Sequence, residues 1–326
     1  MIAMSVDESA RAPTSALYPP VEPFAAGHLD VGDGHRLYWE ANGNPAGRPA
    51  LFLHGGPGGG CHADHRRLFD PAAYMIVLFD QRGCGRSLPH SQLQDNTTQH
   101  LIADIEALRA MLNVEDWLLL GGSWGAALAL AYAQAHPRRA RGLVLRGVFA
   151  ARRCEVDWLY REGGASALFP EAWERFVAPI PPQEREDLVA AYHRRLTGAD
   201  IAGRMEAART WCSWESELLT LRPRWRRNGA ASAAEIALAR IEAHYFVNDS
   251  FLPEGALFAG MGAIAHTPGV MVQGRYDVVT PARTANALHK IWPASQLRIA
   301  PDAGHATSEP GICAGLVAAT DEMRTL

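Results

Sequence analysis

The feature that most constrains the fold is the pentapeptide GGSWG at residues 121–125, which lies between an apolar run and a helical segment. The run before it, residues 117–120, is Trp-Leu-Leu-Leu, and residues 126–137 after it favour a helix ending near a proline. A serine in so tight a strand-to-helix turn needs glycine neighbours to avoid clashes, and the turn lifts its hydroxyl above the sheet. Ser123 is therefore a candidate nucleophile; the alternative is a glycine-rich turn with an incidental serine.

Similar apolar runs recur along the chain and alternate with segments of helical spacing. Uninterrupted apolar runs suit strands that are buried on both faces of a parallel sheet. Such strands are predicted at residues 50–53, 75–79, 117–120, 141–148, 268–273 and 296–300. Helices are predicted at residues 98–114, 126–137 and 282–291. The alternation indicates an α/β fold with a mostly parallel, doubly wound sheet.

This alternation of predicted strands and helices stops after Phe149 and resumes near residue 268. The intervening hundred or so residues are rich in Trp, Arg, Glu and Ala, with helical spacing and no convincing buried strand. We interpret residues 150–255 as a helical cap inserted into a core formed by residues 17–149 and 256–326. Residues 1–16 are expected to be a loose N-terminus.

A serine needs a base to take its proton and an acid to orient that base. Asp277 follows the strand predicted at 268–273, and His305 follows the next predicted strand. The chain order Ser, Asp, His is the one expected for α/β-hydrolases, so we predict a triad of Ser123, Asp277 and His305. Asp302 is a rival acid, but its place so near His305 in sequence favours a turn residue.

The segment HGGPGGG at residues 54–60 follows the first predicted buried strand. Hydrolases of this kind place one oxyanion-stabilising N–H there and the second on the residue after the nucleophile. We assign these two donors to the backbone amides of Gly56 and Trp124. A phosphate-binding loop is the alternative, but the GK[ST] ending and the dinucleotide spacing are both missing. The following motif, DQRGCGRS at 80–87, is interpreted as a structural brace of the loop beside the turn.

Composition excludes several other classes of protein. With 48% hydrophobic and 20% charged residues, the 326-residue chain is typical of a globular protein. A formal net charge of -4 provides no basic surface for nucleic acid. Five scattered cysteines without a CxxC pair predict neither a disulfide framework nor a zinc site, and we expect no metal and no cofactor. No signal peptide or membrane span is evident, so a soluble cytoplasmic protein is expected; the oligomeric state is left open.

Taken together, HGGPGGG, DQRGCGRS, GGSWG, WxxWE, RIExHYF, GRYD and GH resemble the proline iminopeptidase (prolyl aminopeptidase) family of α/β-hydrolases. The likeness runs from about Tyr18 to the last dozen residues. It implies an enzyme that releases N-terminal proline from peptides through an acyl-enzyme, without a metal. The family roles fall on the triad and the two oxyanion amides already assigned.

An aminopeptidase must also bind a free, positively charged amine, for which carboxylates are the obvious partners. The resemblance assigns this role to Glu215 and Glu242, which lie in WCSWE and RIEAHYF. An isolated glutamate would more often lie on the solvated face of a helix, but both glutamates lie within aromatic motifs that match the family. Phe149 matches a position that lines the slot for the proline ring, and the Trp124 side chain is a second candidate for it.

Arg146 lies in the same motif, LRGVF, and could assist near the substrate. A structural ion pair at the junction of cap and core is the competing interpretation, so Arg146 is left out of the catalytic set. Departures from the family pattern are Ser216, where glycine is common, and an additional glycine at 163–164. The alternative function is an esterase or amidase acting on small acyl groups, because a triad does not choose between esters and amides. A catalytically inactive binding protein is the remaining alternative, and it would not react with a fluorophosphonate.

Overall fold

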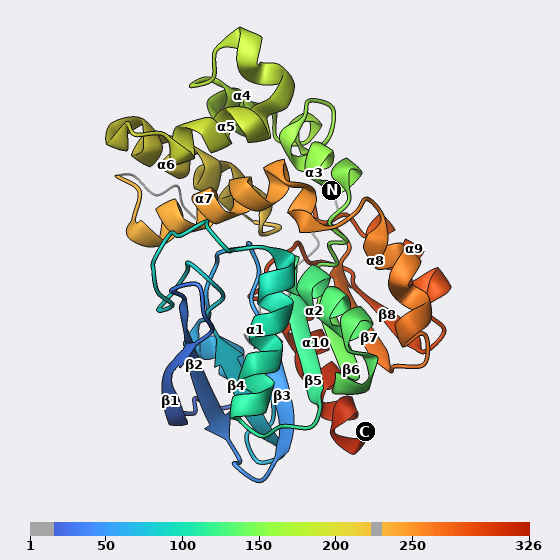
Figure 1. Ribbon diagram of the computed structural model, residues 1–326. Helices are drawn as coiled ribbons and strands as arrows, with labels where there is room; N and C mark the ends of the chain where they lie inside the picture. The colour runs from blue at the N-terminus through green and yellow to red at the C-terminus, as the bar shows by residue number, and fades with distance from the viewer. Residues whose placement is uncertain (1–15, 223–229) are drawn as a thin grey trace, which may run out of the picture.

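The computed structural model describes residues 16–222 and 230–326 (Figure 1). The expected loose N-terminus, residues 1–16, therefore lies almost wholly outside the described residues. Within them, eight strands form one sheet in the order β1-β2-β4-β3-β5-β6-β7-β8. The strands are β1 (Pro23–Asp30), β2 (Arg36–Gly43), β3 (Arg48–Leu53), β4 (Tyr74–Phe79), β5 (Trp117–Gly122), β6 (Ala140–Arg146), β7 (Gly269–Gly274) and β8 (Ser295–Ala300).

Strands β3 to β8 pair in parallel, which confirms the predicted mostly parallel sheet. All residues of β5 and β7 are buried, as expected for strands covered on both faces. The antiparallel hairpin of β1 and β2 was not predicted from the sequence. It extends the sheet at one edge, where β2 runs antiparallel to β4.

Helices cover both faces of the sheet, as Figure 1 shows. On one face lie α1 (Thr98–Met111), α2 (Trp124–Ala135) and α9 (Arg283–Ile291), whose apolar side chains share one buried cluster. On the other face, α10 (Pro310–Glu322) and the 3₁₀ helix η1 (Ala63–Leu68) contribute to a second cluster. The three predicted helices are thus found with ends shifted by up to three residues.

In the described part of the segment between β6 and β7, helices alternate with turns and loops and there is no strand. The segment lies over one end of the sheet (Figure 1). Its α-helices are α3 (Arg153–Tyr160), α4 (Pro170–Val177), α5 (Leu188–Thr197), α6 (Ile201–Leu218), α7 (Ala233–Val247) and α8 (Ala256–Ala259). Short 3₁₀ helices complete the described secondary structure: η2 (Pro137–Arg139), η3 (Ala165–Ala167), η4 (Pro182–Asp187), η5 (Asp249–Phe251), η6 (Gly260–Ile264) and η7 (Met323–Thr325). We retain 150–255 as the proposed cap.

None of the helices in the two described ranges is long and apolar enough to span a membrane. The same ranges contain no group of three His, Cys, Asp or Glu side chains that could hold a metal ion. All five cysteines are described, and each is a free thiol.

Candidate active site

Ser123 occupies a sharp turn between β5 and α2, with φ 58° and ψ -122°. Two glycines make this turn sterically possible. A Cβ on Gly125 would lie 2.0 Å from the carbonyl oxygen of Leu53, and one on Gly121 would lie 2.1 Å from that of Gly125. The turn therefore packs backbone against backbone, and it holds Ser123 in a conformation that side-chain-bearing residues seldom adopt.

The carboxylate of Asp277 is held in the loop after β7 by a dense set of donors. Gln273 Nε2 donates to Oδ2 over 2.9 Å, while the backbone N–H and Oγ1 of Thr280 donate to Oδ1 and Oδ2 over 2.8 and 3.0 Å. His305 Nδ1 lies 2.8 Å from Oδ2, and both residues are buried. Asp302, the rival acid, is exposed at the surface. Asp277 is thus the carboxylate that the structure places against His305.

The other ring nitrogen of His305 faces a cation. Arg146 Nη1 donates to Nε2 over 2.7 Å; since a guanidinium carries no acceptor, Nε2 is unprotonated and Nδ1 carries the hydrogen. Burial lowers the pKa of His305, as does the charge of Arg146, while Asp277 opposes them. Burial also lowers the pKa of Arg146 to about 10. The side-chain partner of Arg146 in the described residues is His305 and not a carboxylate, so the ion-pair interpretation gains no support here.

The loop at residues 54–60 lies directly against the turn that carries the serine. A Cβ on Gly55 would lie 3.3 Å from Ser123 Cβ, and Gly56 has a φ of 109°, which favours glycine. Gly56 lines the same cavity as Ser123, and Trp124 begins α2, where backbone amides have no partner within the helix. Gly56 thus shares a cavity with Ser123, and Trp124 follows Ser123 directly in the chain. Their role as oxyanion donors stays a prediction.

The side chain of Trp124 does not line the slot, which corrects the expectation from the sequence. It is fully buried, stands edge-on to Tyr245 at 4.8 Å, and donates from Nε1 to Gln81 Oε1 over 3.0 Å. Gln81 in turn donates to the carbonyl of His54 over 2.9 Å. Gln81 in the segment 80–87 thus connects the loop at residues 54–60 to Trp124, the residue after Ser123.

Glu215 on α6 and Glu242 on α7 meet in the cavity that contains Ser123. Tyr160 donates its hydroxyl hydrogen to Glu215, and Trp211 Nε1 donates to Glu242 Oε2 over 2.8 Å. Burial raises the pKa of Glu215. Burial and the neighbouring Glu215 raise the pKa of Glu242 well above its ordinary range. Two carboxyl groups placed in this way attract a cation, which would relieve their repulsion.

Aromatic rings line the cavity beside these glutamates. Phe149 packs edge-on to Phe246 at 6.1 Å, and Tyr160 lies 5.7 Å from Phe246 between ring centroids. The cavity measures about 300 Å³ and is also lined by Leu159 and His305. It therefore combines a nucleophile, a pair of acids and an apolar slot large enough for a small ring.

Comparison with known proteins identifies the family to which this chain belongs. A family model described as alpha/beta hydrolase fold matches residues 49–311. A proline iminopeptidase of Xylella fastidiosa is 53% identical over 308 residues, which cover 94% of this chain and 98% of the relative. One from Arabidopsis thaliana is 51% identical over 95% of this chain and 82% of its own length. The chain belongs to the proline iminopeptidase family of α/β hydrolases.

Solved structures agree with the fold of this proline iminopeptidase family member. The crystal structure of a proline iminopeptidase-related protein from Thermus thermophilus matches with a TM-score of 0.57 and 25% identity, over 93% of this chain and 98% of that one. An esterase from Exiguobacterium antarcticum matches with a TM-score of 0.56 at 17% identity, over 93% of this chain and all of the other. The second likeness concerns the fold alone.

Two cavity-lining residues of this family member were missed from the sequence. Phe246 lies one helical turn after Glu242 in the RIEAHYF motif, so the spacing of four residues could have indicated a shared face. Tyr160 at the end of α3 had no such signal.

The departures from the family pattern lie away from the nucleophile. Ser216 is exposed and donates to the carbonyl of Ser213. In the glycine pair, a Cβ on Gly164 would lie 2.1 Å from the carbonyl of Trp158, while Gly163 has a φ of 94°. Both glycines are therefore required by the backbone where α3 ends.

Proposed function

We propose that this enzyme is a serine aminopeptidase that removes proline from the N-terminus of peptides through an acyl-enzyme. The observation that carries the proposal is the pair Glu215 and Glu242, which lies in the same cavity as Ser123. A hydrolase acting on uncharged acyl groups would gain nothing from two buried acids facing the acyl group. An aminopeptidase needs them to bind the substrate's ammonium.

Acylation begins when Ser123 Oγ attacks the prolyl carbonyl carbon and His305 Nε2 takes the hydroxyl proton. In the free enzyme Nε2 accepts from Arg146, so this donor must yield to the serine hydroxyl. Asp277 stabilises the imidazolium that forms. The Gly56 and Trp124 amides stabilise the negative charge on the tetrahedral oxygen, where one such donor typically contributes about 3 kcal/mol.

Collapse of the tetrahedral intermediate breaks the peptide bond. The proton on His305 Nε2 passes to the leaving nitrogen, which departs as the amine of the shortened peptide and leaves a prolyl ester on Ser123. Water then attacks this ester while His305 takes its proton, and the second collapse returns the proton to Ser123 Oγ. The products are free proline and the shortened peptide.

Selection of proline follows from the closed end of the cavity. The two glutamates bind the ring ammonium, while Phe149 and Phe246 offer aromatic faces to the pyrrolidine carbons. An acetyl group on the nitrogen would remove the charge and add bulk at the same place. Substrates with a blocked N-terminus should therefore be excluded.

The experiment that tests this function compares release of arylamine from L-prolyl arylamide, N-acetyl-L-prolyl arylamide and an uncharged acyl ester. The proposal expects the free prolyl compound to be the best substrate and the acetylated one to be nearly inert. If the uncharged ester is turned over as well as the prolyl arylamide and acetylation has no effect, the esterase or amidase alternative holds instead.

A cytoplasmic location is also part of the proposal. It is supported by five free thiols, which suit a reducing compartment. Fractionation of cells that produce the protein, followed by detection with an antibody, tests this location.

A further inference from the structure

Three neighbouring cavities share lining residues, and two of them are lined by the loop at residues 54–60. The catalytic cavity shares Gly55, Gly59, Arg146 and Thr307 with a second cavity of about 200 Å³. That cavity shares His65 and Thr307 with a groove of about 470 Å³. Thr307 lines all three, so the three cavities are neighbours that share lining residues between Ser123 and the groove.

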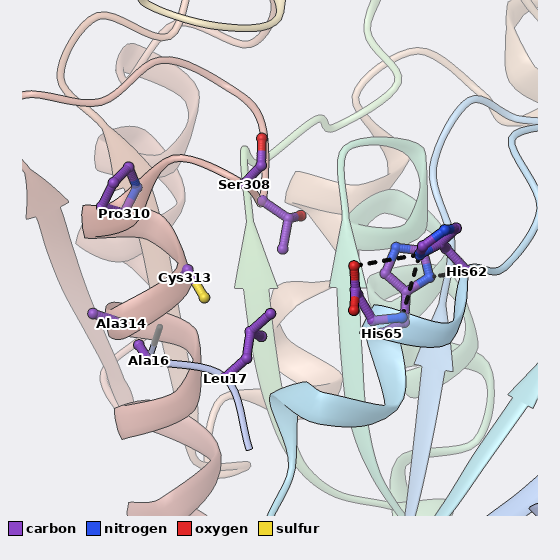
Figure 2. A pocket seen from close by; sticks show the side chains of 10 residues that line it. Ala16, Leu17, His62, His65, Ser308, Pro310, Cys313 and Ala314 are labelled. Atoms are coloured by element: carbon purple, nitrogen blue, oxygen red, sulfur yellow. Dashed lines mark hydrogen bonds and ion pairs between the residues drawn. The ribbon is translucent and has the colours of Figure 1, made fainter. Parts of the chain in front are cut away.

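The groove lies between α10 and η1, as Figure 2 shows. Pro310, Cys313 and Ala314 of α10 form one wall, and His62 and His65 lie on the opposite side. Leu17 contributes an apolar side chain between the two walls (Figure 2). The groove is thus bounded by α10, η1, Leu17 and the residues just before α10, and none of its described lining residues belongs to the proposed cap.

The walls carry little net charge. The single carboxylate, on Asp64, is paired with Arg67 over 2.9 Å. His65 stacks on Phe52 with ring centroids 4.1 Å apart, and burial lowers the pKa of His65 to about 3, so the ring is neutral near pH 7. Small and apolar side chains supply most of the remaining surface. A groove with this lining suits a peptide segment that carries apolar side chains and no charge.

The position of the groove relative to the reaction identifies what reaches it. In the proposed function, the glutamates and Phe149, which line the catalytic cavity, bind the prolyl residue on the acyl side of the scissile bond. In the proposed mechanism the leaving nitrogen receives its proton from His305, and Thr307 lines the same cavity as this histidine. A peptide chain that continues from the leaving nitrogen therefore passes Thr307 toward the groove.

We propose that the groove between α10 and η1 binds the leaving part of the peptide substrate, with a preference for apolar side chains beyond the first residue after proline. This inference rests on the proposed aminopeptidase function and adds a substrate class to it: peptides longer than a dipeptide. An extended peptide advances about 3.3 Å per residue. Each further residue after the scissile bond would therefore lie closer to, or farther into, the groove.

The test fills the groove and compares two substrates. Ala314→Phe places a large ring on the α10 wall, while the matched control Ala318→Phe adds the same ring one turn later, outside the groove. Both alanines are exposed, so neither change overpacks the core. The substrates are L-prolyl arylamide, whose leaving group ends beside the nucleophile, and the peptide Pro-Ala-Leu-Leu.

We expect Ala314→Phe to lower kcat/KM for the peptide about tenfold, the loss of roughly one buried apolar side chain, and to leave the arylamide unchanged. Ala318→Phe should change neither. Equal losses on both substrates, or no loss on either, would overturn the proposed groove. If wild type turns over neither substrate, the aminopeptidase function itself is wrong, which distinguishes the two failures.

The wild-type enzyme gives a second measurement that needs no variant. We expect kcat/KM to rise from Pro-Ala to Pro-Ala-Leu to Pro-Ala-Leu-Leu, and to fall again when the leucines are replaced by aspartates. Equal values across this series would contradict the groove, even with full activity on prolyl arylamide.

Discussion

Arg146 donates from Nη1 to Nε2 of His305 over 2.7 Å, so a half-buried cation contacts the nitrogen that accepts the serine proton in the proposed mechanism. The same arginine crowds the serine turn, because a Cβ on Gly122 would lie 2.5 Å from its Nη2. This arrangement fixes the neutral imidazole with its hydrogen on Nδ1, toward Asp277. It also makes the base a weak proton acceptor until substrate displaces the contact.

The first prediction concerns the pH dependence of kcat/KM. Burial and Arg146 lower the pKa of His305, and the base is active when unprotonated, so activity should persist below the ordinary imidazole value of 6.5 before it falls. Arg146→Gln should move this acid limb to higher pH, because a charge that disfavours imidazolium is removed. Arg209→Gln, an exposed change on α6, is the control. An unmoved limb in Arg146→Gln would contradict this electrostatic role.

The second prediction separates the two candidate acids. Asp277→Asn should lower kcat by about 10⁴-fold, because an amide can no longer stabilise the imidazolium or fix the tautomer of His305. Asp302→Asn should leave kcat unchanged, since Asp302 is exposed. Steady-state kinetics on prolyl arylamide, with circular dichroism to verify folding, measure both. A large loss in the Asp302 variant alone would mean that the acid is misassigned.

The third prediction concerns the amine site. Replacing Glu215 or Glu242 by Gln removes a charge-assisted hydrogen bond to the substrate ammonium, worth roughly 1.5–3 kcal/mol. The loss should appear in kcat/KM for prolyl arylamide, while an uncharged ester is spared. Glu206→Gln, an exposed change on α6, is the control and should alter neither substrate. Equal losses on both substrates would give these glutamates a purely structural role.

The fourth prediction concerns the serine turn. Gly125→Ala would bring a methyl group within 2.0 Å of the Leu53 carbonyl, a clash with backbone that cannot relax by a side-chain rotation. We expect a loss of about 1–3 kcal/mol in the free energy of unfolding, together with loss of activity. Gly262→Ala is the control, because an added Cβ there has no neighbour within 4 Å. Urea titrations of both variants measure the difference.

The sequence predicts the buried strands well because their apolar runs reflect local burial on both faces of the sheet. The hairpin β1–β2 lacks that signal: β1 alternates between exposed and half-buried residues and contains Ala25, Ala26 and Gly27, which favour strands weakly. Its place is set by pairing with β2, and β2 in turn pairs with β4. Such pairing depends on partners distant in sequence.

The candidate site likewise has features that the sequence predicts and features that it does not. Ser123, Asp277 and His305 could be proposed because each follows a recognisable strand, so chain order carried the information. The direction of the Trp124 side chain could not, because Gln81 and Tyr245, both remote in sequence, determine it. The contact between Arg146 and His305 likewise depends on how the end of β6 meets the loop after β8.

The most direct measurement of the central claim is the turnover of L-prolyl arylamide by wild type and Ser123→Ala, prepared in parallel from a host without its own proline iminopeptidase. The account predicts rapid arylamine release by wild type and a loss of roughly 10⁶-fold in the folded variant, because the triad acts as one unit. Turnover by Ser123→Ala at the wild-type rate would contradict the assignment of Ser123 as the nucleophile.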